Sequence, residues 1–345
     1  MSHKVTIQPS NHEFPVETGE SVLDAALRQG FAFPYGCRNG ACGSCLGTLV
    51  AGEVEYPGQQ RPPALKEGDL AAGRALFCQA RPTSDLTIEV REIGAAKDIV
   101  IKTLPCRVAK RELLAHDVMR LKLKLPITER LQFLAGQYVD ILLKDGRRRG
   151  FSLANAPHDD EYLELHVRRV EGGSFTGHVF DDMKEKALLR IEGPLGTFFL
   201  REDSDRPVIL VGGGTGFAPL KGIIENALHH GIGRPMHLFW GVRSRRDLYL
   251  GELPQQWAQE HADFQYTPVL SEPQPEDDWQ GETGMVPEAV VRACPDLAGF
   301  DVYMSGPPAM VDAARTLFEA HGLPAGQLYY DSFEFASDVQ AASGA

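Results

Sequence analysis

The sequence predicts three consecutive domains: a small β-rich α+β domain, an antiparallel β-rich domain and a parallel α/β domain. The first observation is length, because 345 residues suit two or three domains of about 150 residues each. The second is a β-rich beginning that holds a single amphipathic helix. The third is a change near Pro207, after which apolar strands alternate with helices. That alternation indicates a parallel sheet.

The first domain is predicted to span residues 1–93. Its helix lies in the segment ESVLDAALRQG, where apolar residues recur at helical spacing and Gly30 is placed to end the helix. Residues 94–103 have no clear partner and are interpreted as a linker. The expected strands cover 4–9, 12–17, 46–56 and 85–93.

The second domain is predicted at 104–203 and the third at 204–335, followed by a flexible small-residue tail at 336–345. In the second, alternation over 118–125 indicates a strand, and a helix is expected to begin near Gly173. Further strands are expected at 137–146, 148–157 and 161–170, then at 207–213, 235–244, 263–272 and 300–308.

Composition and charge exclude several classes of protein. The chain is 43% hydrophobic and 24% charged, as in ordinary globular proteins. No apolar run approaches the roughly 18 residues that cross a bilayer, so no membrane partner is expected. The net charge of −12 argues against a basic nucleic-acid-binding face. The first residues lack the apolar core of a secretory signal, and we therefore expect a cytoplasmic protein.

Three of the six cysteines lie in the segment PYGCRNGACGSCLG. Their spacing is C-x4-C-x2-C, and one further cysteine follows after 32 residues. This is the plant-type [2Fe–2S] arrangement. A disulfide framework belongs to short secreted chains, and structural zinc, which commonly uses repeated C-x2-C pairs, is the remaining alternative. The expected metal ligands are Cys37, Cys42, Cys45 and Cys78.

The residues between these cysteines suit a cluster. Glycines allow positive φ and close approach of backbone N–H groups to sulfur. Arg38 supplies a fixed positive charge beside an anionic centre. Because Gly40 and Ala41 have no bulk, the loop is expected to lie near the surface, with an acceptor protein docking over 38–44. The glycines concerned are Gly36, Gly40, Gly43 and Gly47.

Two segments, 149-RGFSLAN-155 and 172-GGSFTGHV-179, are individually unspecific, since an Arg, an aromatic and a Ser often merely form a strand. Together they resemble the ferredoxin–NADP reductase superfamily, whose first domain is a six-stranded antiparallel flavin-binding β-barrel. Arg149, Phe151 and Ser152 occupy the family pattern Arg-x-Tyr-Ser. The resemblance implies that Arg149 pairs with the FAD pyrophosphate, Phe151 lies against the isoalloxazine and Ser152 reaches the reactive N5.

The second of these segments is expected to open a helix. Backbone N–H groups of Gly173, Ser174 and Thr176 would then face a flavin phosphate, which the helix dipole favours. The family usually has Tyr where this chain has Phe151, so stacking is kept while a hydroxyl contact is lost. FAD is expected from the resemblance, with FMN as the alternative.

A glycine loop, 211-VGGGTGFAPL-220, lies between a predicted strand and a helix, the context that phosphate binding requires. It resembles the family's nucleotide loop GGTGxAP, and 305-SGPPAM-310 resembles its CGPPxM, where a cysteine lies by the nicotinamide. Ser305 matches that position but lacks the sulfur. The residues carried over are Gly213, Gly214, Thr215, Gly216, Pro219, Ser305, Gly306 and Pro307.

The nucleotide is expected to be NADH rather than NADPH. NADP-specific relatives place a Ser-Arg pair after the next strand to bind the 2′-phosphate, whereas this chain has Ser271 and Glu272. A carboxylate repels phosphate and can accept a hydrogen bond from a ribose hydroxyl. The alternative for NADPH is the basic segment 243-RSRRD-247.

The ending 329-YYDSFEF-335 resembles the family segment that shields the flavin. Phe335 is the candidate cap over the ring, and Glu334 is expected at the nicotinamide site. With Ser152 they form the candidate catalytic set. Core packing by Phe333 is the alternative interpretation of this segment.

The resemblance covers nearly the whole chain in the order β-grasp ferredoxin, flavin, nucleotide. It implies an NAD(P)H-dependent oxidoreductase, because a flavin accepts two electrons from NADH and passes them singly to a [2Fe–2S] cluster. The chain resembles reductase components of methane, phenol and benzoate oxygenases. Its run 104–125 and its ending more resemble CDP-6-deoxy-Δ3,4-glucoseen reductases, which serve a deoxysugar dehydrase. A non-catalytic iron–sulfur sensor is the alternative of another class.

Overall fold

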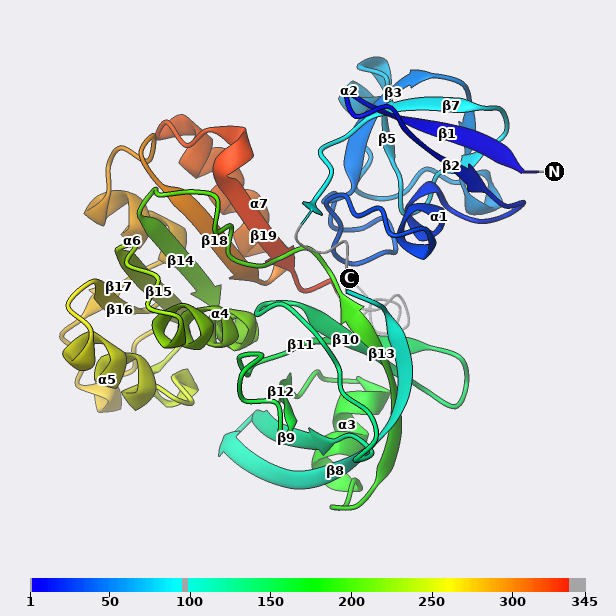
Figure 1. Ribbon diagram of the computed structural model, residues 1–345. Coiled ribbons are helices and arrows are strands. Elements are labelled where there is room, and N and C mark those ends of the chain that lie inside the picture. Colours follow the sequence, from blue (N-terminus) through cyan, green and yellow to red (C-terminus); the bar gives the residue numbers. More distant parts are fainter. Residues whose placement is uncertain (1, 95–98, 335–345) are drawn as a thin grey trace. The chain divides into compact units, whose positions relative to one another are not determined.

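The computed structural model describes residues 2–94 and 99–334. These fall into two compact units, divided after Val100 (Figure 1). Among the described helices, none combines the length and the apolar character that crossing a bilayer requires.

The first unit is a mixed sheet with one main helix, the β-grasp arrangement that the resemblance implied. Strand β1 pairs antiparallel with β2 and parallel with β7, and the sheet order is β2-β1-β7-β3-β5. Ser21 Oγ accepts a hydrogen bond from Asp24 N and so caps α1. The elements are β1 (His3–Gln8), β2 (His12–Val16), α1 (Val22–Arg28), β3 (Leu46–Ala51), β4 (Val54–Glu55), η1 (Pro57–Gln59), α2 (Glu67–Ala71), β5 (Arg74–Leu76), β6 (Arg81–Pro82) and β7 (Leu86–Glu89).

The strand expected at 46–56 is divided into β3 and β4. The break is at Gly52, which has φ +92°, and a Cβ added there would lie 2.2 Å from the Asp85 carbonyl oxygen. Only glycine tolerates both conditions. The strand expected at 85–93 ends at Glu89.

The first half of the second unit is an antiparallel sheet ordered β11-β10-β13-β8-β9-β12. An isolated bridge between Leu153, directly after β11, and Leu165 of β12 brings the two edges of this sheet together, as expected of a six-stranded barrel. Helix α3 follows β12, as the sequence predicted. The elements are β8 (Lys102–Ala115), β9 (Val118–Lys124), β10 (Tyr138–Leu142), β11 (Arg148–Ser152), β12 (Leu163–Arg168), α3 (Ser174–Asp181) and β13 (Leu188–Leu195).

The second half is the predicted parallel α/β sheet, ordered β17-β16-β15-β14-β18-β19. Its strands β14, β15, β16 and β18 are mutually parallel. The elements are β14 (Val208–Gly213), η3 (Gly214–Gly216), α4 (Phe217–His229), β15 (Met236–Val242), η4 (Arg245–Asp247), α5 (Glu252–Glu260), β16 (Phe264–Leu270), η5 (Pro275–Asp277), β17 (Glu282–Thr283), α6 (Val286–Ala293), β18 (Asp301–Gly306), α7 (Pro308–Ala320), η6 (Ala325–Gln327) and β19 (Leu328–Ser332).

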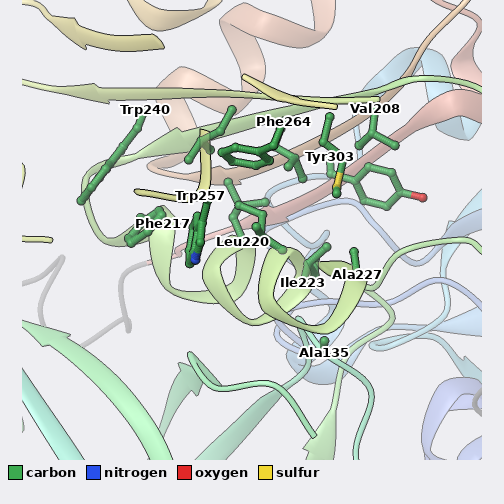
Figure 2. Packing of buried hydrophobic residues seen from close by; sticks show 14 of the residues in the cluster. Ala135, Val208, Phe217, Leu220, Ile223, Ala227, Trp240, Trp257, Phe264 and Tyr303 are labelled. Atoms are coloured by element: carbon green, nitrogen blue, oxygen red, sulfur yellow. The ribbon is translucent and has the colours of Figure 1, made fainter. Parts of the chain in front are cut away.

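Helix α4 packs its apolar face onto this sheet (Figure 2). Phe217 stacks on Trp240 of β15 with ring centroids 4.1 Å apart. The same buried cluster includes Ala135 and Phe198 from the barrel half. Residues of the barrel half and of the parallel sheet therefore contribute to one common buried cluster, which helps to hold the two halves of this unit together.

Candidate functional site

The four predicted ligand thiols converge in the first unit. Cys42, Cys45 and Cys78 are buried and Cys37 is partly exposed. The N–H of Cys42 lies 3.3 Å from Cys37 Sγ, and the N–H of Cys37 lies 3.4 Å from Cys42 Sγ. A hydrogen bond with the Cys37 thiol lowers the pKa of Cys42 to about 6. A hydrogen bond with Cys45, together with burial, raises the pKa of Cys78.

This arrangement fits a [2Fe–2S] cluster. The donor set consists of four thiols, which suits iron–sulfur chemistry. A Cβ added at Gly36 would lie 3.3 Å from Cys42 Sγ, and Gly43 has φ +77°. The backbone therefore passes close to the sulfur ligands at positions where a larger residue would crowd them.

Arg38 is held in place beside these cysteines. It has φ +59°, its Nη2 donates to Asp24 Oδ1 at 2.8 Å, and its carbonyl accepts from Gln79 Nε2 at 2.9 Å. Asp24 also accepts from the Ser21 hydroxyl at 2.8 Å. The positive charge expected in the loop is thus paired with an acid of α1.

The expected surface position of the loop is confirmed at Asn39 and wrong at Gly40. Asn39 is exposed and Ala41 is partly exposed. Gly40 is buried, because Pro62 lies over it: a Cβ added at Gly40 would be 2.8 Å from Pro62 Cβ. The small size of Gly40 therefore allows Pro62 to pack closely against the loop, and Gly40 is not exposed.

In the barrel, the structure brings the two predicted flavin segments together. Arg149 and Phe151 lie two apart on β11 and therefore share a face. The ring of Phe151 packs against Phe175 of α3 at 5.6 Å between centroids. The first segment thus adjoins the first turn of the helix that the second segment opens.

The α3 N-terminus is shaped for an anion. A Cβ added at Gly173, the N-cap, would lie 2.6 Å from Thr176 Oγ1. The Thr176 hydroxyl accepts a hydrogen bond from Val170 N at 3.2 Å and so stabilises the loop before α3. The N–H groups of Ser174 and Thr176 have no partner within the helix and can bind a phosphate. The prediction for Gly173 is wrong, because its N–H donates to the Val170 carbonyl at 3.0 Å.

Ser152 is buried, and its hydroxyl donates to Asp331 Oδ2 at 3.3 Å. Asp331 belongs to β19, 179 residues away in the sequence. Sequence reasoning found the surrounding segment YYDSFEF but not this carboxylate. The pairing of β19 with β18 places Asp331 next to β11, the strand that ends at Ser152.

The glycine loop and the SGPP segment meet at one end of the parallel sheet. Gly213 ends β14, Gly214 has φ +55°, and a Cβ added at Gly216 would lie 1.9 Å from the Ser305 carbonyl oxygen. Thr215 lies in η3 and Pro219 in the first turn of α4. Gly306 ends β18, and Pro307 directly precedes α7. The predicted residues of both segments are therefore neighbours.

Ser305 is fully buried, and its Oγ has no hydrogen-bond partner among the described residues. Such a hydroxyl is costly to leave unpaired. The carbonyl oxygen of the same residue packs against Gly216, so this polar atom lies next to the glycine loop.

Arg168 is a site residue that sequence reasoning missed. It ends β12, and a Cβ added at Gly214 would lie 2.7 Å from its Nη1, so the guanidinium lies against the glycine loop. Its Nε donates to Asp117 Oδ2 at 2.7 Å. The neighbouring Arg169 pairs instead with Asp181, and nothing in the sequence distinguishes the two arginines.

The two segments considered for nucleotide choice lie side by side. Glu272 N donates to the Arg243 carbonyl at 2.8 Å, and both side chains are exposed. The Arg245 guanidinium donates to the Asp277 carbonyl at 3.1 Å, and Arg246 is exposed. Both an acid and a basic group therefore adjoin the carboxyl ends of β15 and β16.

The final segment is only partly described. Phe335 lies outside the described residues. Glu334 accepts a hydrogen bond from the Ser332 hydroxyl at 2.7 Å, and Phe333 N donates to the Gly306 carbonyl at 2.9 Å. The segment thus runs directly beside the SGPP turn.

Three domain families match in the predicted order. Residues 5–83 match the 2Fe-2S iron-sulfur cluster binding domain, residues 105–200 the oxidoreductase FAD-binding domain and residues 210–316 the oxidoreductase NAD-binding domain. The convergent thiols, the α3 N-terminus and the glycine loop fall within the respective matches.

Whole-length relatives support the same assignment. The chain is 39% identical to CDP-6-deoxy-L-threo-D-glycero-4-hexulose-3-dehydrase reductase of Yersinia pestis, over 96% of this chain and 99% of the relative. It is 35% identical to a terephthalate 1,2-dioxygenase reductase component of Comamonas sp., over 96% and 98%. Among solved structures, the Amycolatopsis cytochrome P450 reductase GcoB matches with a TM-score of 0.81 and 35% identity, covering 97% of this chain and all of that one. The chain therefore belongs to the NAD(P)H-dependent iron–sulfur flavoprotein reductases of the ferredoxin–NADP reductase superfamily, with an N-terminal [2Fe–2S] domain.

Proposed function

We propose that this chain carries electrons from NADH through FAD and a [2Fe–2S] cluster to a partner protein, and that the partner is a dehydrase acting on a nucleotide-linked deoxysugar. The observation that carries the proposal is the junction in the second unit. There Ser152 of the flavin-type strand touches Asp331, and Arg168 of the barrel touches the glycine loop at Gly214. A flavin and a nicotinamide held by these segments are neighbours.

Different residues of the barrel bind different parts of FAD. Arg149 and the α3 N-terminus, through the N–H groups of Ser174 and Thr176, bind its phosphates, since both supply positive charge. Phe151 packs against the ring system. Ser152, whose hydroxyl donates to Asp331, offers its oxygen as a hydrogen-bond acceptor at the reacting edge. When bound, FAD supplies the conversion of a two-electron donor to one-electron steps.

The parallel sheet holds the nucleotide. The N–H groups of the loop from Gly213 to Gly216 receive its pyrophosphate, and Arg168 adds a cation there. Ser305 uses its unpaired hydroxyl on the nicotinamide side. Glu272 favours NADH, because its carboxylate repels the 2′-phosphate of NADPH and accepts from a ribose hydroxyl.

The four ligand cysteines hold the cluster, from which electrons leave to the partner. A deoxysugar dehydrase is proposed first because the Yersinia relative, named for such a dehydrase, is 39% identical over almost the whole length. An oxygenase component is the second candidate. It is supported by the Comamonas terephthalate dioxygenase reductase at 35% and by an Amycolatopsis aromatic O-demethylase reductase subunit at 39%.

The test is anaerobic titration of the purified holoprotein with NADH, followed by addition of either acceptor. Bleaching of the flavin absorbance and then reduction of the cluster are expected. Turnover with the dehydrase and its sugar substrate, above that with a terminal oxygenase, supports the first acceptor. A flavin that NADH leaves oxidised would contradict the function as a whole.

A further inference from the structure

Helix α4 touches the flavin-type strand directly after Ser152. Two consecutive helix residues make the contact, and they lie five and six residues after Gly216, the end of the glycine loop. Lys221 Nζ donates to the Ala154 carbonyl at 3.1 Å. A Cβ added at Gly222 would lie 3.2 Å from the Leu153 oxygen and 3.0 Å from the Asn155 oxygen. The helix therefore rests on three successive backbone carbonyls.

Lys221 is a buried cation with a defined set of partners. Its side chain is 9% exposed and lies 2.9 Å from Glu225 Oε2 and 3.5 Å from Glu164 Oε1. Burying a charge costs free energy unless the partners are well placed. An apolar side chain of similar length would fill the same space without that cost. The charged side chain therefore indicates that the structure requires Lys221 and its partners in this one arrangement.

The strand side of the contact is equally fixed. Ala154 N donates to the Glu164 carbonyl, and Asn155 Oδ1 accepts from Glu164 N, both at 2.8 Å. Segment 153–155 is therefore held against β12 by hydrogen bonds that do not involve α4.

A second polar contact between the two halves involves the same carboxylate, that of Glu164. His166 Nε2 lies 2.9 Å from Glu164 Oε1, and its Nδ1 lies 3.1 Å from the hydroxyl of Tyr249 in the nucleotide half. His166 and Tyr249 are both buried. The two halves thus meet through one continuous buried network that is centred on Glu164.

We propose that Lys221 and Gly222 form a latch that sets the distance between the flavin on β11 and the nicotinamide at the glycine loop. The inference rests on the proposed function and adds Lys221 as a positioning residue for hydride transfer. The latch connects the carbonyls that follow Ser152 to the helix that follows the loop. Its loss changes the distance between the reacting rings more than the affinity for either cofactor.

Two variants test the latch in the FAD-loaded full chain. Lys221→Met removes the charge and the hydrogen bond at similar length. Gly222→Ala keeps every charge and inserts a methyl group against two carbonyls. Lys184→Met, an exposed lysine of the barrel half, is the matched control.

Stopped-flow bleaching of the flavin at saturating NADH measures the reaction, and equilibrium titration measures the dissociation constant for NAD⁺. Both variants are expected to slow bleaching on the order of 10-fold, since small misplacements of reacting groups carry large rate costs. The NAD⁺ dissociation constant should change less than about 2-fold, a split that separates positioning from binding. The long-wavelength charge-transfer absorbance of reduced flavin with NAD⁺ should weaken.

Wild-type bleaching and charge-transfer absorbance in both variants would overturn the latch, as would a loss of NAD⁺ affinity that accounts for the whole change in rate. If Lys221→Met does not retain FAD, Gly222→Ala alone decides between these results. A wild-type flavin that NADH does not bleach would refute the proposed function, and the latch with it.

Discussion

At the scale of single residues, Cys42 offers the sharpest separation of the two redox sites. Its thiol exchanges close contacts with Cys37, and the low pKa supplies a ready thiolate. Cys42→Ser is expected to abolish the visible cluster absorbance. Reduction of ferricyanide by NADH should persist, because this dye can take electrons from the flavin in the other compact unit. Loss of ferricyanide reduction in a protein that still holds FAD would contradict separate sites.

Glu272 decides nucleotide choice in the proposed function. Replacing it by Arg exchanges a repulsion of the 2′-phosphate for an attraction, worth about 1–3 kcal/mol or roughly 5–150-fold in kcat/KM. The ratio of kcat/KM for NADH to that for NADPH should fall accordingly. Glu276→Arg, which makes the same charge change at an exposed position of η5, is the control. An unchanged ratio in Glu272→Arg would move the choice to Arg243, Arg245 and Arg246.

Replacing Ser305 by Ala should have opposite effects on the stability of the nucleotide-free protein and on the rate of flavin reduction by NADH. Its buried hydroxyl is unpaired among the described residues, so Ser305→Ala removes a group that costs about 1–3 kcal/mol when unsatisfied. We expect the melting temperature of the nucleotide-free protein to be unchanged or higher. Flavin bleaching by NADH should be slower, because the contact with bound nucleotide is lost. A lower melting temperature with normal bleaching would assign Ser305 a purely structural role.

At the scale of elements, local patterns predicted α1, α3, α4 and most strands, because apolar spacing and capping residues lie within each segment. They did not predict α2, β8 or β13. The break at Gly52 was not predictable. It depends on the Asp85 carbonyl, a neighbour distant in the sequence. Arg168 and Lys221 escaped prediction for the same reason: each is one of many basic residues until the fold places it against Gly214 or Ala154.

The buried network on β12 and α4 makes the second unit sensitive to acid. Burial alone would raise the pKa of Glu164, but the hydrogen bond from His166 and the charge of Lys221 outweigh it and lower the pKa to about 2. A lowered carboxyl pKa contributes stability above its unfolded value of 4.5, and that stability is lost as the pH falls towards 2. The contribution is about 3 kcal/mol at neutral pH.

Unfolding of the second unit, followed by tryptophan fluorescence, should therefore become easier between pH 4.5 and about 2. In Glu164→Gln the stability at neutral pH should be lower and its loss over this range should be shallower. Glu185→Gln is the control, since Glu185 is an exposed glutamate of the same unit. Equal slopes in wild type and Glu164→Gln would show that other carboxyl groups govern acid unfolding.

At the scale of the whole molecule, the order of the domains was predictable because each carries its own short pattern: spaced cysteines, a strand with RGFS and a glycine loop. The relation between the flavin and nucleotide halves was not. It rests on a shared core that includes Ala135 and Phe198 beside Phe217, and on the polar crossings from Glu164. Contacts of this kind join residues whose separation in the sequence carries no signal.

The division after Val100 allows a final prediction about the electron path. A shortened chain of residues 101–345 retains the barrel, the parallel sheet and their common core. It is expected to bind FAD and to reduce ferricyanide with NADH at a rate within about 3-fold of the full chain, because the FAD-binding and NAD-binding domain matches, 105–200 and 210–316, both lie within it. Transfer to the partner protein should be lost, because the cluster ligands are gone. Adding back a separate chain of residues 1–100 should restore transfer only weakly, since linkage raises the effective concentration of one unit near the other to the millimolar range. Full transfer to the partner by the shortened chain alone would place the exit of electrons at the flavin and refute a path through the cluster.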